Sequence, residues 1–167
     1  MLVIKDATVA DIAIIREITK QTWPQTYVPI IGAEQVAYML ALFYNNEALE
    51  EQIEELHHHF ILCFRDEQPV GFASFSEIEQ QVFKLHKLYV LPSEQGKGTG
   101  RALTGHITTA VLKEGGRELR LNVNRYNHSA KSFYEKAGFR HLLDEDISIG
   151  NGYFMNDHVL VLDIQQK

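Results

Sequence analysis

The chain has 167 residues and a formal net charge of −6, with 16 Lys and Arg against 22 Asp and Glu. A chain of this length can bury a full hydrophobic core without disulfides or metals, so we expect a single domain over residues 1–167. Hydrophobic residues make up 45% and charged residues 23% of the sequence, values that exclude a disordered or collagen-like protein. The acidic balance argues against binding to the nucleic-acid backbone and favours cationic or neutral partners.

The sequence also indicates a compartment. It contains no apolar run near the length of about 20 residues that crosses a bilayer and does not open on a basic stretch followed by an apolar segment. Cys63 is the single cysteine, so no internal disulfide can form, and its apolar neighbours predict a buried thiol. We therefore expect a soluble cytoplasmic protein that binds neither membranes nor nucleic acid.

The N-terminal part of the chain predicts a strand and three helical segments. Residues 2–4 predict the strand, and Thr8 with Asp11 three residues later predicts a capping box at the start of a helix. The helical spacing of apolar residues then breaks around residues 23–29, which include two prolines, and resumes from Val36. A third helical segment over residues 49–56 is expected to present an acidic, solvated face.

The rest of the chain alternates between strand and helix patterns. The predicted strands cover residues 60–64, 70–78, 82–91, 119–123, 139–143 and 153–164, with a loop over residues 144–151. One predicted helix has its apolar residues over 103–111 and stops at Gly115 and Gly116, and a second covers residues 130–137. The short link between residues 78 and 82 predicts an antiparallel hairpin. The order β-α-α-α-β-β-β-α-β-α-β-β predicts an α/β fold with a mixed, mostly antiparallel sheet flanked by helices.

The clearest chemistry lies between the strand over residues 82–91 and the next helix, where Gly96, Gly98 and Gly100 are spaced two apart. Glycines at such a turn let main-chain N–H groups converge, and the following helix N-terminus adds partial positive charge. This pattern predicts a site for a phosphate or pyrophosphate, with Lys97 and Arg101 adding charge at its rim. A plain turn is the alternative, since glycines after a strand also serve that purpose. The spacing fits neither the Walker motif nor the dinucleotide fingerprint.

Two motifs resemble those of the GNAT superfamily of acyl-coenzyme-A-dependent N-acyltransferases. Gln95, Gly98 and Gly100 match its Gln/Arg-x-x-Gly-x-Gly/Ala motif, and a strand-then-helix block matches further along the chain. The residues of this block are Leu121, Val123, Asn127, Ala130, Phe133, Tyr134, Glu135, Lys136, Gly138 and Phe139. The resemblance covers nearly the whole chain and implies a GNAT fold whose fourth and fifth strands splay apart. Residues 23–39 and 153–157 are similar to the subgroup that includes polyamine acetyltransferases.

The resemblance implies acetyl-CoA as the acyl donor and no requirement for a metal. Backbone amides of the glycine loop would hold the pyrophosphate, the pantetheine arm would pair with the fourth strand like an added strand, and the N–H of Val90 would polarise the thioester carbonyl. Asn127 is expected both to cap a helix and to contact the pantetheine arm. The expected cofactor-binding residues are Leu88, Tyr89, Val90, Gln95, Gly96, Lys97, Gly98, Thr99, Gly100, Arg101 and Asn127.

The resemblance makes Tyr134 the candidate general acid, because a phenol with a pKa of about 10 can protonate a departing thiolate. Helical spacing alone favours core packing of Tyr134 beside Phe133, and the resemblance reverses that preference. Many relatives carry a glutamate base on the fourth strand, but Lys84 occupies that position here. His86 lies two residues further on the same strand face, and its ordinary pKa of about 6.5 suits a base. Glu77 on the partner strand is the second candidate, and a structural role for His86 is the alternative.

Aromatic and histidine residues complete the set of candidates. Trp23 and Tyr27 are expected to line an acceptor pocket, because aromatic faces attract ammonium groups, with core packing as the alternative. The consecutive histidines His57, His58 and His59 cannot gather around one metal, so no metal site is predicted.

We expect acetyl transfer to a primary amine of a small molecule, which includes polyamine-like amines, by direct attack in a ternary complex. The alternatives are a protein lysine or N-terminal acceptor and a catalytically silent acyl-CoA-binding regulatory module, and the resemblance favours a homodimer.

Overall fold

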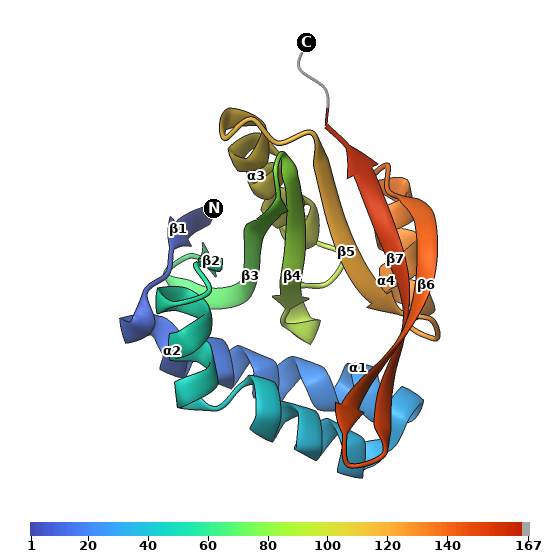
Figure 1. Cartoon of the computed structure of the whole chain (residues 1–167). Helices are drawn as coiled ribbons and strands as arrows, with labels where there is room; N and C mark the ends of the chain where they lie inside the picture. Colours follow the sequence, from blue (N-terminus) through green and yellow to red (C-terminus); the bar gives the residue numbers. More distant parts are fainter. Residues whose placement is uncertain (165–167) are drawn as a thin grey trace. The chain divides into compact units, whose positions relative to one another are not determined.

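The computed structural model describes residues 1–164 (Figure 1). Its strands are β1 (Leu2–Asp6), β2 (His59–Arg65), β3 (Gln68–Glu79), β4 (Val82–Val90), β5 (Glu118–Asn124), β6 (Arg140–Gly150) and β7 (Tyr153–Asp163). Its α-helices are α1 (Ile12–Phe43), α2 (Asn46–Glu54), α3 (Thr99–Lys113) and α4 (His128–Lys136). The sheet order is β1-β2-β3-β4-β5-β7-β6, with β4 and β5 parallel and the pairs β1–β2, β2–β3, β5–β7 and β6–β7 antiparallel. The predicted α/β class with a mixed, mostly antiparallel sheet is confirmed.

The chain divides into two compact units. The first comprises Met1–Ser76 and Lys87–His106, and the second comprises Glu77–His86 and the residues from Ile107 onward. Strands β3 and β4 and helix α3 each contribute residues to both units. The expectation of one domain over residues 1–167 stays a prediction.

The first unit begins with the predicted strand and capping box. The N–H of Ala10 donates to Thr8 Oγ1 at 3.2 Å, and the N–H of Thr8 donates to Asp11 Oδ2 at 2.9 Å. The cap starts a short 3-10 turn (Val9–Asp11) that continues into α1. Cys63 on β2 is buried as predicted, and burial raises the pKa of its thiol.

Helix α1 differs from the prediction of a break around residues 23–29. Its backbone stays helical through Pro24 and Pro29, and the interruption lies at Gly32, where φ is +84°. A proline removes one N–H donor from a helix but keeps φ near the helical value, whereas a φ of +84° lies in the left-handed region that favours glycine. The prediction was wrong because it took the prolines, and not the glycine, as the helix breaker.

The segment Val9–Phe43 is long and apolar enough, by length and composition alone, to cross a membrane, contrary to the expectation from the sequence. Its apolar stretch is only 11% buried, although Ile15, Ile18 and Trp23 are buried in the first unit. Gly32 interrupts the helix, and one helix of sufficient length and composition is weak evidence for a membrane span. We treat α1 as a helix of the globular fold.

Helix α2 shows the amphipathic pattern that the sequence indicates. Asn45 caps it by accepting the N–H of Ala48 on Oδ1 at 2.8 Å, and Leu49 is fully buried. Glu50 and Glu51 are exposed, which confirms an acidic solvated face. The helix ends at Glu54, before the expected end of the segment at residue 56.

The second unit contains a long twisted hairpin of β6 and β7, with β5 beside β7 (Figure 1). The predicted loop over residues 144–151 was wrong, because β6 continues to Gly150 and the turn is confined to Asn151 and Gly152. The sequence Asp144-Glu145-Asp146 has low strand propensity. Its pairing with His158, Asp157 and Asn156 of β7 overrides that local preference.

Strands β4 and β5 pair in parallel over Val82–Leu85 and Glu118–Leu121. Both strands continue beyond this ladder, β4 to Val90 and β5 to Asn124. The parallel ladder of β4 and β5 fits the predicted splay of the fourth and fifth strands, and beyond it β5 stays paired with β7 to Asn124. Helix α3 ends before Gly115 and Gly116 as predicted, and a Cβ at Gly116 would collide with Val111.

Candidate functional site

The glycine loop of the first unit lies where the sequence predicts it, between β4 and α3. A 3-10 turn (Pro92–Glu94) precedes it, and Gly96 and Gly98 have φ angles of +82° and +85°. A Cβ placed on either glycine would meet nothing within 4 Å. Backbone conformation, and not packing, therefore requires glycine at both positions.

The N-terminus of α3 supplies the donors of this loop. The N–H of Ala102 donates to the carbonyl of Gly98 at 3.0 Å, which closes the first helical turn. The preceding N–H groups, those of Thr99, Gly100 and Arg101, have no acceptor inside an α-helix, and the macrodipole places partial positive charge there. This geometry suits a phosphate or pyrophosphate group.

An ion pair between the buried Glu94 and the half-buried Arg65 lies at the loop, and no motif in the sequence indicates it. Arg65 Nε donates to Glu94 Oε2 at 2.8 Å, and Thr99 Oγ1 donates to the same oxygen at 3.2 Å. The hydrogen bond and charge of Arg65 lower the pKa of the Glu94 carboxyl. Because Glu94 precedes Gly96 and Thr99 follows Gly98, these contacts connect the two sides of the left-handed part of the loop. The Thr99 hydroxyl already donates to Glu94, so Thr99 would contribute to an anion site through its main-chain N–H.

The last residues of β4, the predicted partners of the pantetheine arm, are half-buried. Tyr89 belongs to an aromatic cluster in which its ring lies 5.9 Å from Trp23 and 6.3 Å from Tyr27, and the hydroxyls of Tyr27 and Tyr89 are 3.1 Å apart. Trp23 is only 5% exposed, which favours core packing for this candidate. Tyr27 is half-buried and can still offer its ring edge to a ligand.

In the second unit, His86 lies on a polar face of the sheet. The residues of this face lie on segments that are far apart in the sequence, so no sequence motif groups them. Strand alternation puts Lys84 and His86 on one face, and the parallel pairing of β4 with β5 puts Asn122 on the same face. Asn122 Nδ2 donates to Asp157 Oδ2 at 3.2 Å and to Glu145 Oε2 at 3.1 Å. These five side chains define the polar face of the second unit.

Asp157 is the buried carboxylate of the polar face. Burial raises its pKa, while the amide of Asn122 and the charge of Lys84 oppose the rise. A buried acid inside a polar cluster is a candidate functional group. Lys84, which occupies the position of the glutamate in many relatives, is therefore near a carboxylate supplied by β7. Because this arrangement joins β4, β5 and β7, no spacing along the chain reveals it.

The second base candidate, Glu77, has a structural partner. It is exposed near the end of β3, where its Oε2 accepts the main-chain N–H of Gln81 at 3.2 Å. This hydrogen bond stabilises the turn between β3 and β4. Glu77 therefore has a structural role at this turn, whereas His86 lies half-buried on β4.

Helix α4 positions the candidate acid and the expected cap. Asn127 caps the helix as predicted, with its Oδ1 accepting the N–H of Ala130 at 3.3 Å. Tyr134 is 8% exposed, and its ring centroid lies 5.2 Å from that of Phe133 and 5.5 Å from that of Phe139. The ring therefore packs in an aromatic group, and a catalytic use of its hydroxyl is a separate proposal.

Comparison with known proteins identifies the family. Residues 27–154 match the family described as the acetyltransferase (GNAT) domain. The chain belongs to the GNAT acetyltransferase family. It is an acetyl-CoA-dependent N-acetyltransferase, and acetyl transfer in this family needs no metal.

Individual relatives agree with this assignment. The chain is 28% identical over 141 residues to the spermidine N(1)-acetyltransferase of Thermoplasma acidophilum, covering 82% of this chain and 87% of that protein. It is 35% identical over 74 residues to the peptidyl-lysine N-acetyltransferase YjaB of Escherichia coli, covering 44% of each. The crystal structure of PaiA N-acetyltransferase from Thermoplasma acidophilum in complex with coenzyme A matches with a TM-score of 0.83 and 24% identity, covering 98% of this chain and 99% of that one. This structural similarity shows a shared fold.

Proposed function

We propose that this GNAT enzyme acetylates a primary amine of a small polycationic molecule of the polyamine type, by direct attack of the amine on acetyl-CoA in a ternary complex. The observation that carries the proposal is the similarity to a spermidine N(1)-acetyltransferase along most of both chains. The similarity to a lysine acetyltransferase covers less than half of each chain. The net charge of −6 supports a cationic acceptor, because an acidic surface raises its local concentration.

The donor is proposed to bind through the glycine loop. The main-chain N–H groups of Thr99, Gly100 and Arg101 would hold the pyrophosphate, because those of Gln95 and Lys97 already donate to the carbonyls of Pro92 and Glu94. The side chains of Lys97 and Arg101 would add positive charge. Leu88 and Val90 would pair with the amides of the pantetheine arm as one strand pairs with another. The N–H of Val90 is then the proposed donor to the oxyanion that forms on the thioester carbon.

His86 is the proposed general base. The ammonium group of the acceptor must lose a proton before nitrogen attacks, and a half-buried imidazole can accept it directly or through water. Asp157 and Glu145 on the same polar face would attract the ammonium group. As the C–N bond forms and the C–S bond breaks, Tyr134 is the proposed acid that gives the leaving thiolate its proton.

The acceptor proposal is tested by thiol release from acetyl-CoA with spermidine, spermine, a lysine peptide and a peptide with a free N-terminus. We expect kcat/KM for the polyamines to exceed that for either peptide by at least about ten-fold, which corresponds to about 1.4 kcal/mol of transition-state stabilisation. A preference for a peptide would assign the enzyme to protein acetylation. Thiol release with none of the amines would favour the silent acyl-CoA-binding module.

The base assignment is tested separately on the best acceptor. His86→Ala should lower kcat/KM by about 100-fold and remove the acidic limb of its pH profile, because the proton acceptor is lost. Glu79→Gln, an exposed change on β3, is the matched control and should leave both unchanged. If Glu77→Gln removes the acidic limb and His86→Ala does not, the base is Glu77.

A further inference from the structure

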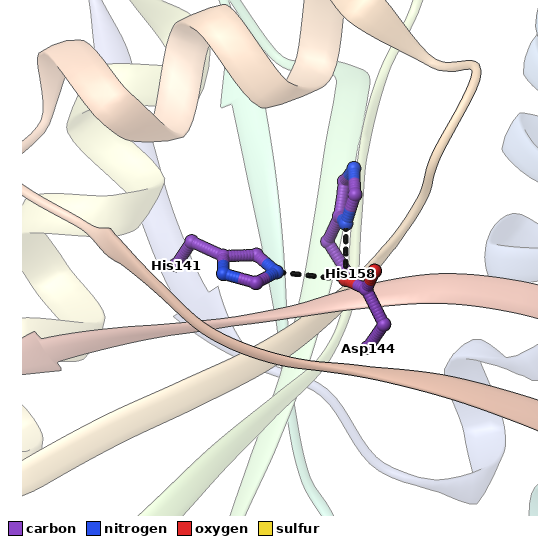
Figure 2. A group of neighbouring side chains, drawn as sticks. All are labelled: His141, Asp144 and His158. Atoms are coloured by element: carbon purple, nitrogen blue, oxygen red, sulfur yellow. Dashed lines mark hydrogen bonds and ion pairs between the residues drawn. The ribbon is translucent and has the colours of Figure 1, made fainter.

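The β6–β7 hairpin of the second unit places two histidines around one aspartate. We propose that His141, Asp144 and His158 form a binding site for a transition-metal dication of the Zn²⁺ type. The acetyl transfer itself needs no metal, so this site adds a second ligand to the enzyme and does not depend on the proposed acceptor. Figure 2 shows the two imidazoles directed at the carboxylate, with the hydrogen bonds converging on it.

An irregularity in the strand pairing brings the three side chains to one face. In a regular strand, residues three apart point to opposite faces, so His141 and Asp144 would be separated. Here His141 pairs with Leu160 and Asp144 pairs with His158, and the register shifts between His141 and Leu143. The extra residue of this bulge moves His141 onto the face of Asp144. Bulges often redirect a side chain in this way beside functional sites.

The ligand atoms already converge. Asp144 Oδ1 lies 2.7 Å from His141 Nε2 and 2.6 Å from His158 Nδ1, and the three atoms all lie within 4.8 Å of one another. Tetrahedral coordination at Zn–N and Zn–O lengths of about 2.0–2.2 Å needs ligand atoms about 3.3 Å apart. The carboxylate oxygen must therefore move away from each ring by about 0.6 Å. Half-exposed side chains can make such a shift by rotation about their own bonds.

The chemistry of the ligand set selects the metal. Two imidazole nitrogens and one carboxylate oxygen suit Zn²⁺, Co²⁺, Ni²⁺ or Cu²⁺, whereas Mg²⁺ and Ca²⁺ prefer oxygen ligands throughout. The side chains of His141, Asp144 and His158 are 50%, 48% and 17% exposed. A dication can therefore enter from solvent, and water can complete its coordination.

The neighbouring charges fix the carboxylate and balance the site. Arg125 lies 3.9 Å from the second oxygen of Asp144, Oδ2, so Oδ1 is left for the histidines. The guanidinium is itself paired with Asp146 at 2.8 Å and donates to the carbonyl of Glu145 at 3.0 Å. Asp144 and Asp146 together outweigh the charge of Arg125, which leaves a net negative site for a cation.

The experiment uses metal-free full-length enzyme, titrated with ZnCl₂ by calorimetry and with Co²⁺ by visible absorption. We expect one equivalent of Zn²⁺ per chain, a Co²⁺ spectrum of tetrahedral type, and no heat with Mg²⁺. Asp144→Asn and His158→Gln should each weaken Zn²⁺ binding by at least about ten-fold, since each removes a ligand. Circular dichroism confirms that the variants fold, and His141→Gln, which changes a half-exposed side chain, gives the same readout if His158→Gln does not fold.

His59→Gln is the matched control, because His59 Nε2 also contacts one aspartate, Asp6, at 2.7 Å. It lies beside His57 and His58, the other histidine cluster of the chain. Zn²⁺ affinity should not change in this variant. The proposal is overturned if Zn²⁺ does not bind, if binding survives all three changes at the hairpin, or if His59→Gln abolishes it.

Discussion

Glu94 is the residue on which the shape of the glycine loop depends. Its buried carboxylate accepts hydrogen bonds from Arg65 on β2 and from Thr99 at the first turn of α3. Removing the charge of Arg65 would leave the buried carboxylate of Glu94 without this counter-ion, which is costly in a protein interior. The loop that is proposed to hold the donor is therefore shaped by side chains that do not themselves face the donor.

Glu94→Gln should make the free energy of unfolding less dependent on acid pH. Arg65 lowers the folded-state pKa of Glu94 below the unfolded value of about 4.3, so the unfolded state binds the proton more readily. The carboxylate stabilises the fold fully above about pH 5 and loses this contribution as pH falls through its folded pKa. Urea unfolding at neutral and acid pH measures this. The difference between wild type and Glu94→Gln should be large at neutral pH and shrink in acid, and a constant difference would contradict the ion pair.

A substitution at Tyr134 can distinguish a packing role of the ring from a catalytic role of the hydroxyl. Tyr134→Phe keeps the ring that packs against Phe133 and Phe139 and removes only the hydroxyl. If the hydroxyl protonates the thiolate, kcat should fall by about 100-fold while KM for acetyl-CoA stays near the wild-type value. Steady-state kinetics measures both, with Tyr126→Phe, at a 62% exposed position, as the control. Full activity of Tyr134→Phe would assign the residue to the core alone.

At the scale of elements, apolar periodicity predicted every strand in order, but it predicted two helical segments over the span of α1 (Ile12–Phe43). It failed where a single backbone angle or a tertiary pairing decided the outcome. Gly32 interrupts α1 because its φ is positive. Pro24 and Pro29, which lie in the segment where the break was predicted, are accommodated in the helix. Strand β6 extends through Asp144–Asp146 because β7 pairs with it. Local composition predicts neither the backbone angle of Gly32 nor the pairing of β6 with β7.

The candidate site likewise has one part that the sequence predicts and one part that it does not. The glycine loop could be predicted because its residues are adjacent in sequence and its conformation requires glycine. The polar face of the second unit could not, because Lys84, Asn122 and Asp157 come from three strands. The bulge beside His141 likewise joins residues whose spacing argues against a shared face. Sites whose residues are brought together by strand register cannot be predicted until the pairing of the strands is known.

Gly98→Ala tests the loop as an element. At a φ of +85° an alanine costs about 1–2 kcal/mol, and relief of that strain would turn the main-chain N–H groups away from the pyrophosphate. We expect a lower unfolding free energy and a KM for acetyl-CoA raised several-fold. Gly105→Ala is the control, because Gly105 is an exposed position inside α3 where a Cβ meets nothing within 4 Å. It should stabilise the protein by about 0.5–1 kcal/mol with KM unchanged, and equal KM values in both variants would argue against the loop as the donor site.

At the scale of the whole molecule, net charge and local charge have opposite signs. The chain is acidic overall, with a formal charge of −6, yet the glycine loop that is proposed to bind an anionic donor combines a helix N-terminus with Lys97 and Arg101. Long-range steering follows the total charge, whereas an anion in contact with the loop responds to nearby donors. An acidic protein can therefore attract a polycation from a distance and still bind a diphosphate at one place.

This separation predicts how salt will act on the two kinds of acceptor. Kinetics with spermidine and with a monoamine of similar length should be compared between about 0.02 and 0.3 M ionic strength, over which the screening length falls well below the size of the protein. Because the attraction grows with the charge of the acceptor, kcat/KM for spermidine should fall several-fold and that for the monoamine much less. Saturating acetyl-CoA removes any salt effect on donor binding from the comparison. Equal salt dependence for both amines would mean that the acidic surface plays no part in choosing the acceptor.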